Sequence, residues 1–327
     1  MALWPRSLRC NIRKVPLYYE DMMKDGFIRE IRTGISGGVL LAEPLARHTT
    51  YRVGGPAEVL ASPATREEAA WLCGFAKRSG APLTVLGAGS NVIAPDAGIA
   101  GVVLHMRQPK GRIEFMDGWR VSADAGVMLE DLVRAASSRG YGGLEPLAGV
   151  PGTVGGAVVM NAGTRDTETA SLVASVDALD ADGKRRVFAR EDLAFGYRYS
   201  VFKDPGRLVL GAEFRLGPAD PAESLQRIDA FVADRWKKYP MDGSSAGSVF
   251  KRPPGDYPGR LIEAAGCKGM RVGGALVSER HANFIVNTGT ATAADIVELV
   301  ERVRRAVFEK TGIRLELEQI ILQAYLP

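Results

Sequence analysis

The sequence is poor in the residues that build metal centres and disulfide frameworks. Only three histidines and three cysteines occur among its 327 residues. The cysteines, Cys10, Cys73 and Cys267, are odd in number and far apart, which fits neither paired disulfides nor a zinc-binding pattern. So few histidines also argue against a histidine-rich metal site and a Ser-His hydrolase. We therefore expect a protein without a metal, in a reducing compartment, which points to the cytoplasm.

Long apolar runs and one-sided charge are also absent. No apolar run approaches the roughly 20 residues that span a bilayer, and Met1–Arg13 lacks the continuous apolar core of a signal peptide. Basic and acidic residues are interleaved, and the net charge is only +4, so no basic arm is available for nucleic acid. We expect neither a membrane nor a nucleic-acid partner. The small positive excess favours an anionic small-molecule substrate.

The length of 327 residues exceeds one ordinary core and predicts two or three domains. Periodicity predicts a strand over 58–61, a capped helix from Thr65 to Gly80 and a buried strand over 82–86. Residues 1–44 are interpreted as an N-terminal extension. We expect further helices over 128–138, 222–238, 260–265 and 292–312, and further strands over 172–179, 186–189, 208–214, 282–286 and 315–322.

Two glycine-rich loops come from separate sections of the chain. The first, Gly87-Ala88-Gly89-Ser90-Asn91, follows a buried strand, where glycines let backbone N–H groups approach and cradle a diphosphate. Val92 stands where a Rossmann loop has glycine, so this is not a Rossmann site. The second cluster is 149–157 with 161–163. Two such loops suit a long ligand with a central diphosphate, such as FAD. The alternative is a loop-rich β-domain with several unusual φ angles.

A serine follows a small-residue pair in Ala246-Gly247-Ser248. Such a serine most often caps a helix or closes a turn, and the segment lacks the Gly-x-Ser-x-Gly pattern of a nucleophile elbow. A hydroxyl tuned by Lys251, Arg252 or a carboxylate could instead donate a proton.

For two carboxylates and an arginine, the sequence likewise allows both a structural and a functional interpretation. Glu316 and Glu318 alternate on a predicted strand and so point to one face, either a solvated edge or a cleft. Arg198, in an aromatic and basic stretch, is either a surface salt-bridge partner or a fork for a substrate carboxylate.

The ordered set of motifs is similar to the UDP-N-acetylenolpyruvoylglucosamine reductase (MurB) family. The resemblance spans roughly residues 45–322, and its order and spacing are more specific than any single piece. The matching segments are 51–55 (YRVGG), 86–91 (LGAGSN), 143–156, 195–198 (FGYR), 246–251 (AGSVFK) and 315–318 (LELE).

The resemblance implies an α+β fold. Residues 45–217 would form a two-part FAD-binding region of the vanillyl-alcohol-oxidase (PCMH) type, divided at about residue 110, and residues 218–327 a C-terminal α+β substrate-binding domain. It also implies that NADPH reduces FAD. Flavin N5 then delivers hydride to the methylene carbon of UDP-N-acetylglucosamine enolpyruvate, the neighbouring carbon takes a proton, and UDP-N-acetylmuramate results. The short connection between Lys251 and Arg260 is similar to the compact type II subgroup. A monomer is expected.

The resemblance also implies roles for individual residues. Ser248 would donate the proton, with Arg198 and Glu318 completing the catalytic set and no metal. The expected cofactor contacts are Tyr51, Arg52, Gly87, Ala88, Gly89, Ser90, Asn91, Gly149, Pro151, Gly152, Gly155, Gly156, Asn161 and Gly163. The expected substrate contacts are Tyr197, Lys238, Lys251 and Arg252.

Two rival functions remain at this stage. One is an FAD oxidase of the same fold, which often tethers its flavin through a histidine such as His48 or His105. The other is a nucleotide-binding regulator with an inactive site. The presence of Arg198, Ser248 and Glu318 together argues against the second.

Overall fold

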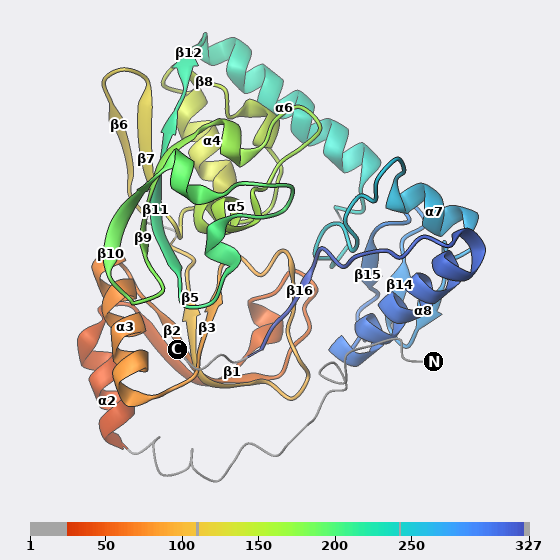
Figure 1. The fold of residues 1–327 in the computed structure, drawn as a ribbon, viewed down its shortest axis with the longest axis horizontal. Coiled ribbons are helices and arrows are strands. Elements are labelled where there is room, and N and C mark those ends of the chain that lie inside the picture. Colours follow the sequence, from red (N-terminus) through yellow and green to blue (C-terminus); the bar gives the residue numbers. More distant parts are fainter. Residues whose placement is uncertain (1–24, 109–110, 242, 324–327) are drawn as a thin grey trace.

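The computed structural model describes residues 25–108, 111–241 and 243–323 (Figure 1). The sequence expectation for Met1–Arg13 therefore falls outside the described residues. Within them the chain forms two larger sheets with helices packed on them. We call residues 25–105 the first section and residues 113–218 the second section. A smaller C-terminal section of helices and strands, residues 239–323, follows. No helix in these ranges is long and apolar enough to cross a membrane.

The first sheet has the order β1-β2-β5-β3, parallel except for the edge pair β1–β2. Helix α3 connects β2 to β3: Thr65 accepts a hydrogen bond from the Glu68 N–H at its start, and Gly80 ends it at φ 68°. The elements are β1 (Gly38–Pro44), β2 (Pro56–Ser62), α3 (Arg66–Ser79), β3 (Leu83–Leu86), β4 (Val92–Ile93) and β5 (Ile99–His105).

The interpretation of residues 1–44 as an extension is wrong for residues 25–44. Helix α2 (Asp25–Gly34) packs against α3, and strand β1 pairs with β2 along its length. The reason is visible in the sequence, because Ile28, Ile31 and Ile35 recur at helical spacing and are buried in the main core.

The second sheet is antiparallel throughout, with the order β10-β9-β11-β7-β6. Helix α5 packs on β11 and β7. The glycine-rich stretch expected to be loop contains this helix, capped by the Thr153 hydroxyl, which accepts from the Gly156 N–H. The elements are β6 (Ile113–Met116), β7 (Arg120–Asp124), α4 (Leu129–Ser137), β8 (Tyr141–Gly142), α5 (Val154–Met160), β9 (Val173–Leu179), β10 (Arg185–Ala189), β11 (Leu208–Arg215) and β12 (Gly217–Pro218).

Helix α6 (Pro221–Lys238) runs along the second section and leads to the C-terminal section (Figure 1). There α8 packs on a sheet of order β13-β14-β15 and on α7. The elements are α7 (Pro258–Ala264), β13 (Arg271–Val272), β14 (Ala275–Val277), β15 (Ile285–Asn287), α8 (Ala293–Thr311) and β16 (Ile320–Ile321). Of the strand expected over 315–322, only β16 is observed as a strand. Residues 315–319 instead lie beside the segment that contains Ser248 and form one β-bridge with it, between Phe250 and Leu317.

Two of the contacts between the C-terminal section and the first section involve residues 92–96. Strand β16 pairs with β4 in parallel, so the chain end returns to the first section. The Asp96 carboxylate accepts hydrogen bonds from the N–H groups of Ala293 (2.8 Å) and Ala294 (2.9 Å) in the first turn of α8. Asp96 therefore caps a helix of another section and links the two sections.

We expect Asp96→Ala to lower the free energy of unfolding by about 1–2 kcal/mol, because two helix N–H groups lose a charged acceptor. Thermal or urea unfolding measures the change. Asp117→Ala, in the exposed turn between β6 and β7, is the matched control and should change stability little. Equal stability of both variants would contradict the capping role.

Candidate active site

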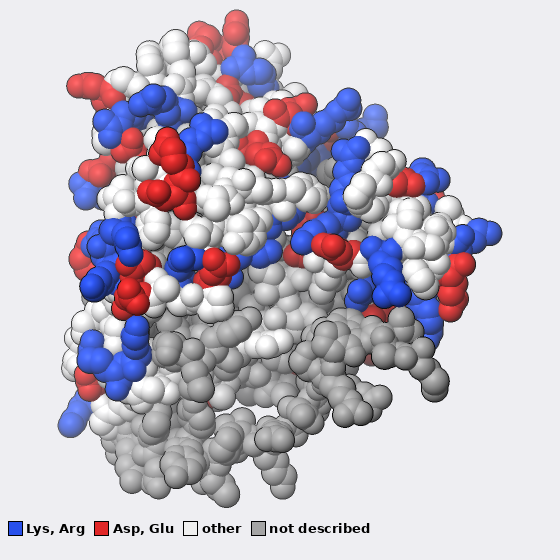
Figure 2. All heavy atoms as spheres, viewed as in Figure 1, with Lys and Arg blue, Asp and Glu red and all other residues white. Residues whose placement is uncertain are grey.

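A cleft of about 1570 Å³ lies where the three sections meet. A second hollow of about 450 Å³ adjoins it, and both are lined by Arg198, Ser248 and Glu318. Figure 2 shows basic side chains gathered along the boundary between the C-terminal section and the rest of the molecule. Six arginines and two glutamates line the cleft, so its charge suits an anionic ligand. They are Arg52, Arg165, Arg198, Arg207, Arg235, Arg252, Glu168 and Glu318.

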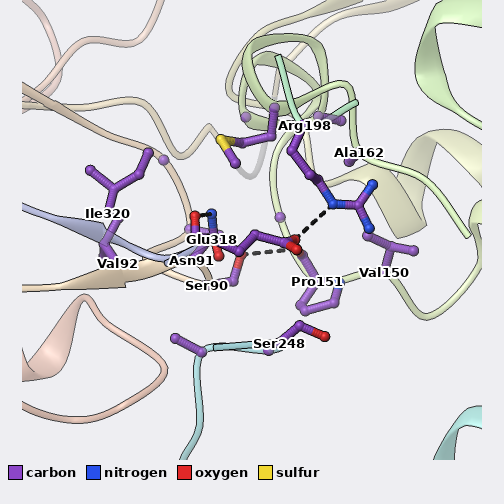
Figure 3. Close-up of a pocket in the computed structure, with 18 of the residues that line it drawn as sticks. Ser90, Asn91, Val92, Val150, Pro151, Ala162, Arg198, Ser248, Glu318 and Ile320 are labelled. Atoms are coloured by element: carbon purple, nitrogen blue, oxygen red, sulfur yellow. Dashed lines mark hydrogen bonds and ion pairs between the residues drawn. The ribbon is translucent and has the colours of Figure 1, made fainter. Parts of the chain in front are cut away.

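The first glycine loop lies along this cleft and has the features of an anion cradle. Among the described residues, none of the N–H groups of 87–91 donates a hydrogen bond to a protein acceptor. Gly89 has φ 66°, and a Cβ there would lie 2.1 Å from the His48 carbonyl oxygen. The Ser90 hydroxyl donates to the Pro151 carbonyl at 2.9 Å, which joins this loop to the second one (Figure 3). Unpaired backbone donors between two tight loops fit the diphosphate of FAD.

Arg198 stands in a two-residue hairpin turn. Gly196 and Tyr199 exchange backbone hydrogen bonds at 3.0 and 3.1 Å, which leaves Tyr197 and Arg198 at the tip. Arg198 has φ 54°, in the left-handed region that favours glycine. An arginine at such a position carries backbone strain, and strained non-glycine residues concentrate at functional sites. Its Nε donates to Glu318 Oε1 at 2.7 Å (Figure 3).

Ser248 and Glu318 lie on two adjacent extended segments of the C-terminal section. The Glu318 N–H donates to the Val249 carbonyl at 2.8 Å, and the Lys251 N–H donates to the Glu316 carbonyl at 2.9 Å. The Ser248 hydroxyl has no hydrogen bond to any described residue, and Figure 3 shows it across the cleft from the Arg198–Glu318 pair. The hydroxyl is therefore available to a bound ligand.

The Glu318 carboxyl is in an unusual environment for an acid. Burial raises its pKa above the ordinary value, and the neighbouring Arg198 guanidinium opposes this effect. Glu316 is different although it is only two residues away, since its side chain is 74% exposed and pairs with Lys251, whereas that of Glu318 is 11% exposed. The two glutamates expected to share one face thus have different surroundings.

Most of the expected contact residues line the cleft, but five do not. Tyr51 is fully buried between sections, where its hydroxyl donates to Gln319 Oε1 at 3.1 Å. Asn161 is buried and donates to Glu168 and to the Gly196 carbonyl, so it supports the Arg198 hairpin. Gly149 supports Arg235, whose Nε donates to the Gly149 carbonyl at 3.0 Å. These three are therefore placed behind the cleft wall.

Two expected substrate contacts also fall outside both hollows. Lys238 is on the exposed side of α6 and pairs with Asp234 at 2.6 Å. Lys251 pairs with Glu316 at 3.2 Å. The remaining expected residues line one or both hollows: Arg52, Gly87, Ala88, Gly89, Ser90, Asn91, Pro151, Gly152, Gly155, Gly156, Gly163, Tyr197, Arg198, Ser248, Arg252 and Glu318.

Several lining residues were missed from the sequence. Arg235 and Tyr239 come from the end of α6, with the guanidinium 5.5 Å from the ring centroid. Burial lowers the pKa of Arg235. Helical spacing of an arginine and a tyrosine was the available signal. Arg207 directly precedes the strand predicted over 208–214, Arg165 lies in the loop after Gly163, and neither belongs to a pattern that marks a site.

The histidines offered for a flavin tether are engaged elsewhere. His48 Nε2 lies 3.0 Å from Glu43 Oε1, and His105 Nδ1 lies 3.2 Å from the Ser62 hydroxyl. The two rings meet edge to face at 4.8 Å, and burial lowers the pKa of His105 to about 4. Neither histidine lines the cleft. In the described part of the chain, no cluster of histidine, cysteine and acidic residues could hold a metal ion.

The sheets, the two glycine loops and the basic cleft define a flavin nucleotide-binding protein, and residues 57–188 match the FAD binding domain model. The expected α+β fold with an FAD-binding region and a separate C-terminal domain is confirmed. Residues 239–322 match the C-terminal domain of UDP-N-acetylenolpyruvoylglucosamine reductase.

Individual relatives agree with these two matches. The chain is 48% identical over 289 residues to the UDP-N-acetylenolpyruvoylglucosamine reductase of Moorella thermoacetica, covering 88% of this chain and 95% of that one. It is 41% identical to that of Geobacter metallireducens, with 90% and 98% covered. The crystal structure of the Thermus caldophilus enzyme aligns with a TM-score of 0.74 at 38% identity, over 88% of this chain and 100% of that one. The chain belongs to the UDP-N-acetylenolpyruvoylglucosamine reductase family.

Proposed function

We propose that this chain uses NADPH to reduce UDP-N-acetylglucosamine enolpyruvate to UDP-N-acetylmuramate, a step of peptidoglycan precursor synthesis. The observation that carries the proposal is the meeting of Arg198, Glu318 and Ser248 where the large cleft joins the smaller hollow. A hydride donor in the cleft and an enol ether in the hollow would meet at these three side chains.

The residues of the cleft fit FAD. The unpaired N–H groups of 87–91 would hold its diphosphate, with Gly152 and Gly156 leaving room on the opposite side. When bound, FAD would supply the hydride-transfer chemistry that connects NADPH to the methylene carbon of the enolpyruvyl group. The protein then has to hold the substrate, stabilise developing charge and supply one proton.

Arg198 would hold the substrate carboxylate. Its Nε is taken by Glu318, and its Nη2 lies 3.5 Å from the Gly163 carbonyl. The rest of the guanidinium edge remains available to a carboxylate. Hydride addition pushes negative charge onto that carboxylate, so a fixed cation lowers the barrier. Glu318, with its raised pKa, would orient Arg198 and donate to the same developing charge when protonated.

Ser248 would supply the proton to the carbon next to the methylene group. A serine hydroxyl is a weak acid, but the developing enolate is a strong base, so the transfer becomes feasible once water is excluded. The Ser248 segment is held firmly by Asn283, whose amide exchanges hydrogen bonds with the Phe250 backbone at 3.0 Å. A fixed donor position favours protonation from one side.

The smaller hollow would take the nucleotide end of the substrate. Its lining contains several cations suited to a nucleoside diphosphate. They are Arg198, Arg252, Arg260, Lys268 and Arg280. Arg252 is further held by its N–H, which donates to the Tyr197 hydroxyl at 3.2 Å.

Anaerobic absorbance spectroscopy tests the proposal. NADPH should bleach the flavin band of the purified protein, and the enolpyruvyl substrate should restore it in the absence of oxygen. Denaturation should release the flavin, since neither His48 nor His105 faces the cleft. Flavin retained on the polypeptide, or recolouring by oxygen and an alcohol only, would favour the oxidase instead.

The proposal includes a cytoplasmic location, NADPH and the enolpyruvyl nucleotide as small-molecule partners, and a monomer. Free thiols at Cys73 and Cys267 support a reducing compartment.

A further inference from the structure

Arg207 carries an unused hydrogen-bonding edge inside the cleft. Its Nη1 donates to the Val201 carbonyl at 2.8 Å and to the Asp204 carboxylate at 2.7 Å. Its Nε is buried and has no hydrogen-bond partner, and its Nη2 donates to no other described residue. A buried donor without an acceptor is costly, so an arginine anchored at one end with its fork unpaired points to an absent ligand.

The position of Arg207 identifies which part of a ligand it would meet. The loop 87–91 runs along the cleft, and its last residue, Asn91, donates to the Glu318 carbonyl at 3.3 Å. At its first residue, a Cβ on Gly87 would lie 2.9 Å from the Thr153 hydroxyl. The loop therefore has a reacting end at Asn91 and a distal end at Gly87.

Strand β11, which begins directly after Arg207, lies at the distal end. The Ala125 N–H donates to the Leu210 carbonyl at 2.9 Å, and the Gly155 N–H donates to the Ala125 carbonyl at 2.8 Å. Gly155 is two residues beyond Thr153, the neighbour of Gly87. The lining here is mostly apolar and suits a flat base: Met106, Ala125, Leu129, Leu208 and Val209.

We propose that Arg207 is a binding residue for the adenosine half of FAD, with its Nε–Nη2 edge on the oxygens of the adenosine ribose and phosphate. The inference rests on the proposed FAD site. A fork that pairs with two oxygens suits this group better than the isoalloxazine ring, which would lie toward Glu318.

The test compares FAD with FMN, which lacks the adenosine half, by calorimetric titration of flavin-free protein. Arg207→Gln should weaken FAD binding about 10–100-fold, because a charged donor pair is lost, and leave FMN binding unchanged. Arg207→Lys keeps the charge without the fork and should recover only part of the loss. Arg190→Gln, an exposed arginine outside both hollows, is the control for removal of one positive charge.

The possible results separate this inference from the proposed function. If the unaltered chain binds no FAD, the proposed function fails. If the unaltered chain binds FAD and Arg207→Gln binds it equally well, or loses FMN affinity by the same factor, the inference alone is overturned. Unfolding of the flavin-free variants by heat shows whether any loss comes from misfolding. If Arg207→Gln proves to be misfolded, the ratio of FAD affinity to FMN affinity in the milder Arg207→Lys variant tests the inference instead.

Discussion

Ser248→Ala is expected to accept hydride from NADPH at the normal rate but to transfer it to the enolpyruvyl substrate about 10²–10⁴-fold more slowly. This range is the usual contribution of a positioned proton donor. The first half-reaction needs no proton on carbon, whereas the second does. Stopped-flow absorbance under anaerobic conditions measures the two half-reactions separately, as bleaching and return of the flavin band.

The variant should fold normally, which makes the result interpretable. The Ser248 hydroxyl has no hydrogen bond to a described residue, so its removal should change the free energy of unfolding by less than about 0.5 kcal/mol. Ser248→Cys keeps a protic side chain in the same place and should recover part of the second half-reaction. Normal reoxidation of Ser248→Ala by substrate would show that another group supplies the proton.

The proposed catalytic set of Arg198, Ser248 and Glu318 is suggested by the sequence only as an ordered group of motifs. Ser248 by itself suggests a turn hydroxyl, and Glu318 by itself suggests an exposed strand edge. The structure shows how these residues come together, since Glu318 donates its backbone N–H to Val249 and its side chain pairs with Arg198 from another section. Contacts of this kind join positions 120 residues apart, and local periodicity carries no information about them.

Three of the expected contact residues that do not line the cleft share a physical explanation. Tyr51, Gly149 and Asn161 stand in motifs that form the cleft, but their side chains or backbone support it from behind. A motif marks a segment whose geometry is required, and it does not say which of its atoms touch a ligand. The missed cleft residue Arg235 shows the converse, because an ordinary helix end delivers it to the site.

The fold could be predicted where elements have strong local signals. Helices α3 and α8 begin at capped threonines and end at left-handed glycines, and both were expected close to their observed bounds. Strand β1 was missed because its pattern lacks a buried face: Leu40 and Leu41 are both about half exposed. Its existence depends on pairing with β2, a tertiary interaction that the local sequence does not encode.

Gly89→Ala is expected to abolish FAD binding at micromolar flavin while leaving most of the protein folded. A Cβ at this position would lie 2.1 Å from the His48 carbonyl oxygen and 2.7 Å from the Thr49 Cα. Both are backbone atoms, so the loop itself must move. The positive φ of 66° adds about 1–2 kcal/mol of strain. Displacing the loop removes the N–H groups of 87–91 from the positions in which they would meet the diphosphate.

Gly118→Ala separates the clash from the strain. Gly118 has φ 72°, close to that of Gly89, but nothing lies within 4 Å of a Cβ built there, and it belongs to the turn between β6 and β7. This control should lose a similar 1–2 kcal/mol of stability and still bind FAD. Flavin content after purification and titration of the flavin-free protein give the comparison. Full flavin content in Gly89→Ala would mean that the loop does not cradle the diphosphate, and equal losses in both variants would attribute the effect to destabilisation. Loss in Gly89→Ala alone ties FAD binding to the backbone of this loop.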